Sequence, residues 1–246
     1  PGKDFVQTDN GGKDFVASNG LLPLSLNRFS APSAANPIVF TVSANVAGYA
    51  PVFQKITIAS DADLKNAVIP LVSLTTPPAG SAVVQADKPL TGGTTAVETK
   101  IETAVSATTP QAVELVLPAG TQVQDANKQP IAATTLKTTI VYYGTTNADA
   151  LKAAAPIMTA VNPIGPNNTP ITGNVSFITA GAVSINMTAG NTAVKNFSKP
   201  MTAEIEINPA LINPNTGVAI KAGDVIPVWS LDETTGQWKY ETTVSV

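Results

Sequence analysis

Paired carboxylates are the residues of this sequence whose spacing comes closest to catalytic chemistry. Glu204 and Glu206 stand two apart in a β-rich segment, so both side chains are expected on one face of a strand. Two carboxyl groups placed in this way can serve as acid and base on a glycosidic bond. Such an enzyme also needs a groove with aromatic walls, and only 5% of the chain is aromatic. We therefore interpret the pair as a solvated strand face, with a hydrolase as the weaker alternative.

Calcium is the one metal ion that the sequence suggests, and we expect no other cofactor. Asp61-Ala62-Asp63 and Asp125-Ala126-Asn127 place oxygen atoms at alternate positions, as loop calcium sites do. Neither segment has the glycine and distal glutamate of a helix-loop-helix site. Asp and Asn side chains also bond to nearby backbone in ordinary turns. We favour such Asx turns over a calcium site, whose ligands would be Asp61, Asp63, Asp125 and Asn127.

Three aromatic residues near the end of the chain are the best candidates for ligand binding. Trp229, Trp238 and Tyr240 flank a predicted turn at residues 232–236. If Trp238 and Tyr240 share one strand face, their rings form a platform that stacks on a sugar. The alternative is cross-strand packing, which is favoured because both tryptophans of the chain fall in one hairpin.

The composition excludes several classes of function. The 246 residues include no cysteine and no histidine, so thiolate sites, cysteine nucleophiles and a Ser-His-Asp arrangement are ruled out. The net charge of −3 and the scattered basic residues provide no face for nucleic acid. No run approaches ~18 consecutive apolar residues, so we expect no transmembrane segment. Charged residues make up only 13% of the chain, and the Thr-, Ser- and Asn-rich surface that this leaves is typical of proteins exposed outside the cell.

Runs of alternating β-branched residues bounded by Gly, Pro, Asn or Asp predict an all-β fold. The predicted strands are Ile38–Val46, Gln54–Ser60, Val68–Leu74, Ala96–Val105, Ala112–Leu117, Leu136–Tyr143, Val175–Ile178, Val183–Met187, Ala203–Ile207 and Val225–Leu231, the last in a hairpin with residues 237–246. At most one short helix is expected, over Asn147–Ala155 with Asn147 as N-cap and Pro156 beyond its end. This pattern favours two antiparallel Greek-key β-sandwich domains.

A Pro- and Gly-rich segment, residues 75–80, separates the two predicted domains. Residues 1–78 are expected to form a small transthyretin-like or immunoglobulin-like sandwich, and residues 79–246 a larger β-sandwich. Within the first twenty residues, Gly2–Val6 recurs as Gly12–Val16 around Asn10-Gly11. This repeat predicts either a loose hairpin or a disordered lead-in.

Two regions resemble known families. Residues 38–74, with the turn Ala47-Gly48-Tyr49-Ala50-Pro51 between strands, resemble the second half of carboxypeptidase regulatory-like modules. Residues 113–120 (VELVLPAG), followed downstream by 226–238, resemble the β-sandwich of cartilage intermediate layer protein and, more distantly, that of ankyrins and netrin receptors. Bacterial cell-surface lipoproteins with tandem sandwich domains look similar. The resemblance implies scaffolding, adhesion or a spacer role, and it brings no catalytic residues.

We therefore expect a non-catalytic structural or adhesion protein that presents or spaces binding surfaces outside the cell. The alternative is a carbohydrate-binding module that uses the aromatic platform. The expected partner is an extracellular protein or a polysaccharide. The expected location is extracellular or at the cell surface, as an outer-membrane lipoprotein or facing the periplasm in a Gram-negative bacterium, with any lipid anchor upstream of Pro1.

Overall fold

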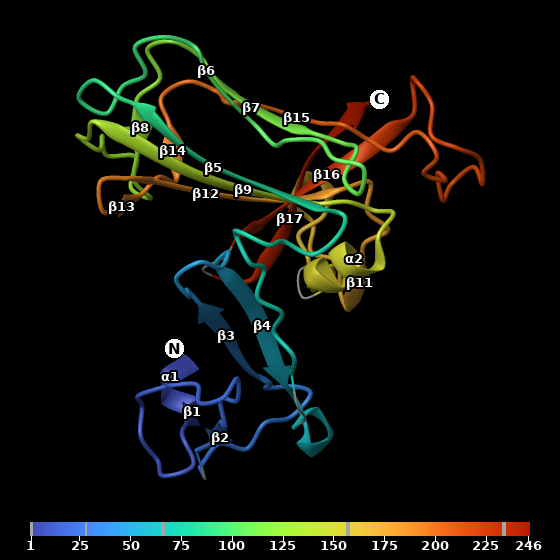
Figure 1. The fold of residues 1–246 in the computed structure, drawn as a ribbon. Helices are drawn as coiled ribbons and strands as arrows, with labels where there is room; N and C mark the ends of the chain where they lie inside the picture. Colours follow the sequence, from blue (N-terminus) through green and yellow to red (C-terminus); the bar gives the residue numbers. More distant parts are fainter. Residues whose placement is uncertain (1, 28, 65–66, 156–157, 233–234) are drawn as a thin grey trace.

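The computed structural model describes residues 2–27, 29–64, 67–155, 158–232 and 235–246. It consists mostly of antiparallel strands, which confirms the predicted all-β class (Figure 1). In Figure 1 the N-terminal strands lie below and a sandwich of two sheets lies above.

Two facing sheets form the sandwich (Figure 1). The four-stranded sheet has the order β13-β12-β9-β5, made of Thr192–Ala193, Ala182–Ala189, Thr135–Tyr143 and Ser81–Pro89. The three-stranded sheet has the order β15-β7-β6, made of Thr202–Ile205, Val113–Leu117 and Thr99–Glu102. A short pair formed by β8 (Val123–Gln124) and β14 (Asn196–Phe197) is hydrogen-bonded beside them.

The core lies between these sheets because both central strands alternate. On β7, Val113, Leu115 and Leu117 are completely buried while the residues between them are half-buried. On β9, Leu136, Ile140 and Tyr142 face the same core, which satisfies the period-two pattern of a half-buried strand. The opposite face of β9 carries Val141 and Tyr143. They belong to a second, smaller cluster with Ala154 of the helix α2 (Ala148–Ala154) and with Ala50 and Val72 of the N-terminal part.

The N-terminal part consists of small elements. A single helical turn, α1 (Gly2–Phe5), precedes β1 (Val6–Gln7), which pairs with β2 (Ser25–Leu26), and β3 (Ile38–Ala44) pairs with β4 (Val52–Ile58) in a separate two-stranded sheet. Among the described residues, no strand ladder joins any residue before position 78 to one after it. The contacts between the two parts come from side chains, and the division into two domains stays a prediction.

The remaining elements lie around the sandwich. Helix α2 (Ala148–Ala154) begins as predicted, because the Oδ1 of Asn147 accepts the N–H of Asp149 at 2.9 Å; Pro156 lies outside the described residues. Strands β10 (Thr159–Val161) and β11 (Asn174–Ser176) pair with each other, with the short helix η3 (Pro166–Asn168) between them. The last two strands, β16 (Val225–Asp232) and β17 (Gln237–Ser245), form the predicted terminal hairpin.

Several local features differ from the expectations. Val68–Leu74 forms no strand, and its one ladder contact is a bridge between Tyr49 and Ser73, because Pro70 has no N–H to give to a sheet. Strand β5 was not predicted. Asp9-Asn10-Gly11 does form a tight turn, in which the N–H of Thr8 donates to the carbonyl of Gly12, but β1 pairs with β2 instead of with the second copy of the repeat.

Candidate functional site

The three predicted aromatic residues lie on one face of the terminal hairpin. Trp229 is the cross-strand partner of Tyr240, and Trp238 is two residues away from Tyr240 on the same strand. Their rings do not form a flat platform, since the planes of Trp229 and Tyr240 meet at 81° with centroids 5.6 Å apart. Phe177 lies between the two tryptophans. Its ring centroid is 4.9 Å from that of Trp238 and 5.5 Å from that of Trp229. All three predicted residues are half-buried, and this edge-to-face cluster is the geometry of aromatic packing.

A backbone contact fixes the position of the hairpin. The N–H of Ile164 donates to the carbonyl of Trp238, and the N–H of Tyr240 donates to the carbonyl of Ile164, both at 2.8 Å. The side-chain amide of Gln237 donates to the carbonyl of Asn162 at 2.7 Å. The lower half of the hairpin is therefore anchored to the loop after β10.

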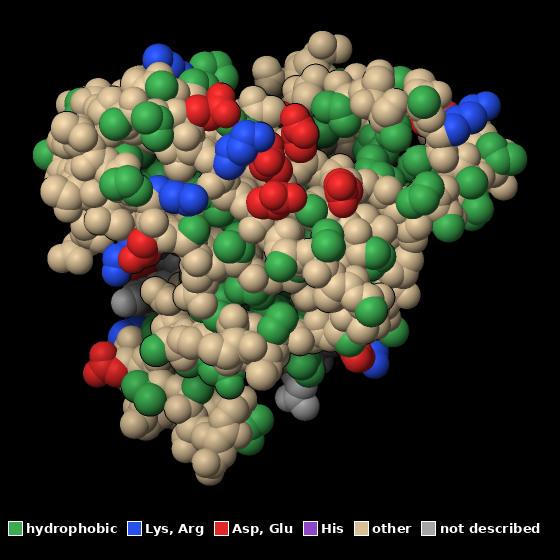
Figure 2. Space-filling model, turned by 45° about the horizontal axis from the view of Figure 1, so that its top comes forward, with side chains coloured by type: hydrophobic (Ala, Val, Ile, Leu, Met, Phe, Trp, Pro, Cys, Tyr) green, Lys and Arg blue, Asp and Glu red, His purple; other side chains and the backbone are tan. Residues whose placement is uncertain are grey.

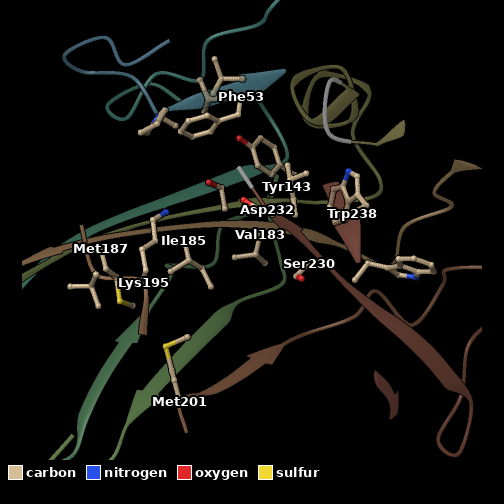
Figure 3. A pocket seen from close by; sticks show the side chains of 18 of the residues that line it. Phe53, Tyr143, Val183, Ile185, Met187, Lys195, Met201, Ser230, Asp232 and Trp238 are labelled. Atoms are coloured by element: carbon tan, nitrogen blue, oxygen red, sulfur yellow. The ribbon is translucent and has the colours of Figure 1, made fainter. Parts of the chain in front are cut away.

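The hairpin, the sandwich and β4 enclose a cleft of about 640 Å³ (Figure 3). We call it the junction cleft. Its walls are Val183 and Ile185 of β12, Phe53 of β4, Trp229 and Trp238 of the hairpin, and Met187, Met201 and Tyr143. Lys195, Ser230 and Asp232 bring polar groups to it (Figure 3). The cleft thus combines apolar walls with several polar groups, the two kinds of group that a ligand site uses.

Tyr143 is the cleft residue whose acid–base properties are most altered. It is almost completely buried, in the smaller hydrophobic cluster. Burial disfavours the phenolate and raises the pKa of Tyr143 to about 12. At neutral pH this residue therefore stays a neutral phenol.

The predicted calcium ligands lie in two separate turns. Asp63 is the last residue of the short helix η1 (Asp61–Asp63). Its Oδ2 accepts the N–H groups of Ala59 and Ser60, which precede the helix, each at 2.9 Å. The Oδ1 of Asp125 accepts the N–H groups of Asn127 and Gln129 at 2.8 and 2.9 Å. The bonds of Asp125 are those of an Asx turn, whereas Asp63 belongs to the capping box at the start of η1, which sequence reasoning did not distinguish from a turn. In the described ranges no three carboxylates are grouped so as to hold a metal ion.

The predicted acid–base pair has a structural role. The Oε2 of Glu206 accepts the N–H of Ala112 at 2.8 Å, which continues the pairing of β15 with β7. Glu204 stands opposite Glu114, and Glu114 stands opposite Glu102 on β6, so three carboxylates form one row across the sheet. Lys100 forms an ion pair with Glu114 at 3.1 Å. Figure 2 shows acidic side chains gathered around a basic one on this exposed face of the molecule.

Comparison of the chain with protein-family models, with curated proteins and with solved structures gave no match. The described helices also lack the length and apolar character needed to cross a membrane.

The sequence pointed to the aromatic wall of the cleft but not to its other walls. Trp229 and Trp238 were predicted, whereas the wall residues Phe53 and Ile185 come from segments far away in the chain, as does Phe177, which packs against the tryptophans. Phe177 lies within the predicted strand Val175–Ile178, although in the structure it follows the end of β11 at Ser176, and it carries no motif. The residues of the cleft are related only by the packing of the hairpin against β12 and β4, and no local pattern encodes that packing.

Proposed function

We propose that this protein is a non-catalytic structural or adhesion protein of the cell surface or extracellular space, which presents or spaces binding surfaces. The observation that carries the proposal is the separate N-terminal β-hairpin below the sandwich, with a cleft where the two meet (Figures 1 and 3). Such an arrangement suits a module that holds a partner at a distance from its attachment point.

The candidate catalytic carboxylates accept hydrogen bonds from the backbone, and this supports the proposed function. Glu206 is tied to the backbone of β7, and Asp63 and Asp125 are tied to their own turns. A carboxylate that stabilises a local backbone conformation is a poor acid or base, because moving it breaks the hydrogen bonds that it accepts. The low charge of the chain and its resemblance to tandem surface sandwiches agree with a role outside the cell.

A carbohydrate-binding module is the second candidate. It is favoured by Trp229 and Trp238, which both line the junction cleft and offer ring surface there. Their tilted arrangement around Phe177 does not match a flat platform. On this candidate function a sugar would enter the cleft and contact the ring edges and the polar groups of Ser230 and Asp232.

A binding screen tests both candidates. The purified chain is applied to immobilised polysaccharides and to extracellular proteins, once with calcium and once with a chelator, and each panel member is then analysed for cleavage. We expect saturable, calcium-independent binding without cleavage. Trp238→Ala should weaken binding in the cleft at least tenfold, which corresponds to about 1.4 kcal/mol, while Trp238→Phe keeps an aromatic ring there.

The same screen can also contradict the proposed function. Cleavage of a panel member that disappears in the double variant Glu204→Gln, Glu206→Gln would establish a hydrolase and overturn the proposal. Binding confined to glycans would favour the carbohydrate module, and binding confined to proteins would favour the adhesion protein.

A further inference from the structure

Strand β12 has a free backbone edge beside the junction cleft. The carbonyl of Met187 accepts the N–H of Val194 at 2.9 Å, on the side of β12 that faces away from β9. Backbone groups alternate in direction along a strand, so the N–H and C=O groups of Val183 and Ile185 point to that same side. In the part of the chain that the structure describes, no strand pairs with those two residues on this side, and no backbone or side-chain hydrogen bond reaches them there.

The side chains next to this edge form an apolar floor. Val183 and Ile185 pack against the sandwich core, yet they are only half-buried and line the junction cleft (Figure 3). On the facing sheet, Ile205 is 41% exposed although its cross-strand partner Val113 is completely buried. The sandwich is therefore open between β12 and β15, and the groups exposed there are a row of backbone donors and acceptors above apolar side chains.

The protein's own hairpin borders this opening without closing it. Trp229 and Leu231 line the cleft, but β16 pairs only with β17 in the described residues. The contacts of Ile164 with Trp238 and Tyr240 hold the hairpin in that place. No strand among the described residues therefore completes β12 at Val183 and Ile185.

The same chain carries an exposed strand that matches the opening. The upper half of the hairpin exposes four valines: Val225 by 56%, Val228 by 37%, Val244 by 45% and Val246 by 40%. Val246 exchanges hydrogen bonds with Gly223 and Asp224, on the β16 side. By alternation, Thr243 and Ser245 direct their N–H and C=O groups outward, away from β16.

We infer that the upper half of β17 from one copy of the chain adds to the free edge of β12 in a second copy. In parallel orientation, Thr243 and Ser245 hydrogen-bond to the backbone of Val183. The side chain of Val244 then lies beside that of Val183, over the apolar floor, and Val246 lies beside Ile185. The exposed Val244 and Val246 and the open side of the sandwich thus cover each other.

The donor strand and the acceptor edge are different surfaces of the molecule. An association of this kind is heterologous, so each added copy leaves one free edge and one free strand. The copies form a growing row or a closed ring, and association does not stop at a symmetric dimer. The inference does not depend on where the protein resides, but the added strand covers the Val183 and Ile185 wall of the junction cleft and therefore competes with any other ligand there.

Sedimentation of the purified chain from micromolar to millimolar concentration tests the inference. We expect the average mass to rise steadily with concentration. Val183→Pro removes an outward N–H of the acceptor edge, and Val244→Lys places a charge on the donor strand; each variant should remain monomeric. Gln85→Pro at the far edge of the same sheet and Val97→Lys at another exposed valine serve as controls and should associate like the unmodified chain.

Mixing the variants gives a readout that misfolding cannot imitate. Val183→Pro keeps an intact donor strand, and Val244→Lys keeps an intact acceptor edge. A mixture of the two should therefore form a one-to-one dimer and grow no further. A monomeric unmodified chain at every concentration would overturn the inference, as would loss of association in the controls or a mixture that stays monomeric.

Discussion

Replacing Gly93 by alanine should unfold or severely destabilise the sandwich, whereas the same change at Gly92 should be mild. Both glycines have positive φ angles, +86° and +57°, in the turn that follows β5. A Cβ on Gly93 would overlap the carbonyl oxygen of Ile131, which is backbone and cannot rotate away, whereas a Cβ on Gly92 meets open space. We expect Gly93→Ala to lower the free energy of unfolding by more than about 3 kcal/mol and Gly92→Ala by about 1 kcal/mol.

The reason lies in the contacts of the Gly93 backbone. Its N–H donates to the carbonyl of Ala133 and its carbonyl accepts the N–H of Val123, so it joins two segments of the sandwich. Urea unfolding followed by circular dichroism gives both free energies. Equal losses for the two variants would show that the close approach to Ile131 does not exist.

Asp125→Ala should destabilise the protein whether or not calcium is present. The Oδ1 of Asp125 accepts two backbone N–H groups, and losing both should lower the free energy of unfolding by about 1–2 kcal/mol. Asp125→Asn is the matched control, because it keeps an oxygen in that position and removes the charge. We expect Asp125→Asn to lower the free energy of unfolding by less than half as much as Asp125→Ala does.

Thermal unfolding with calcium and with a chelator measures this difference. For an Asx turn, the midpoint of each variant should be the same in both conditions. For a calcium ligand, the unmodified chain would unfold at a lower temperature in the chelator, and Asp125→Asn would be as damaging as Asp125→Ala, because a neutral amide is a weaker calcium ligand than a carboxylate.

Strands with strong alternation could be predicted from the sequence, and strands without it could not. Alternating β-branched residues predicted strand β9 (Thr135–Tyr143) almost to its ends. The turn signal between β16 and β17 predicted the terminal hairpin in the same way. Ser81–Pro89 was missed because Gln85, Asp87 and Lys88 interrupt its apolar pattern. It is nevertheless a strand, since nine consecutive residues pair with β9, and this tertiary pairing outweighs its weak local preference.

The candidate site depends on long-range packing to a greater extent than the fold does. The sequence placed Trp229, Trp238 and Tyr240 in one hairpin, and the structure puts all three on one face of it. It could not show that Phe177 enters between the tryptophans or that Phe53 closes the cleft. Those contacts join segments separated by 50 or more residues, for which periodicity and turn signals carry no information.

Exposure of the protein outside the cell is tested most directly by protease treatment of intact parent cells. An antibody against this chain follows its amount, and an antibody against a cytosolic protein reports whether the cells stay closed. We predict that the protein is degraded on intact cells while the cytosolic protein persists. Protection of the protein until the cells are lysed would contradict a role at the cell surface.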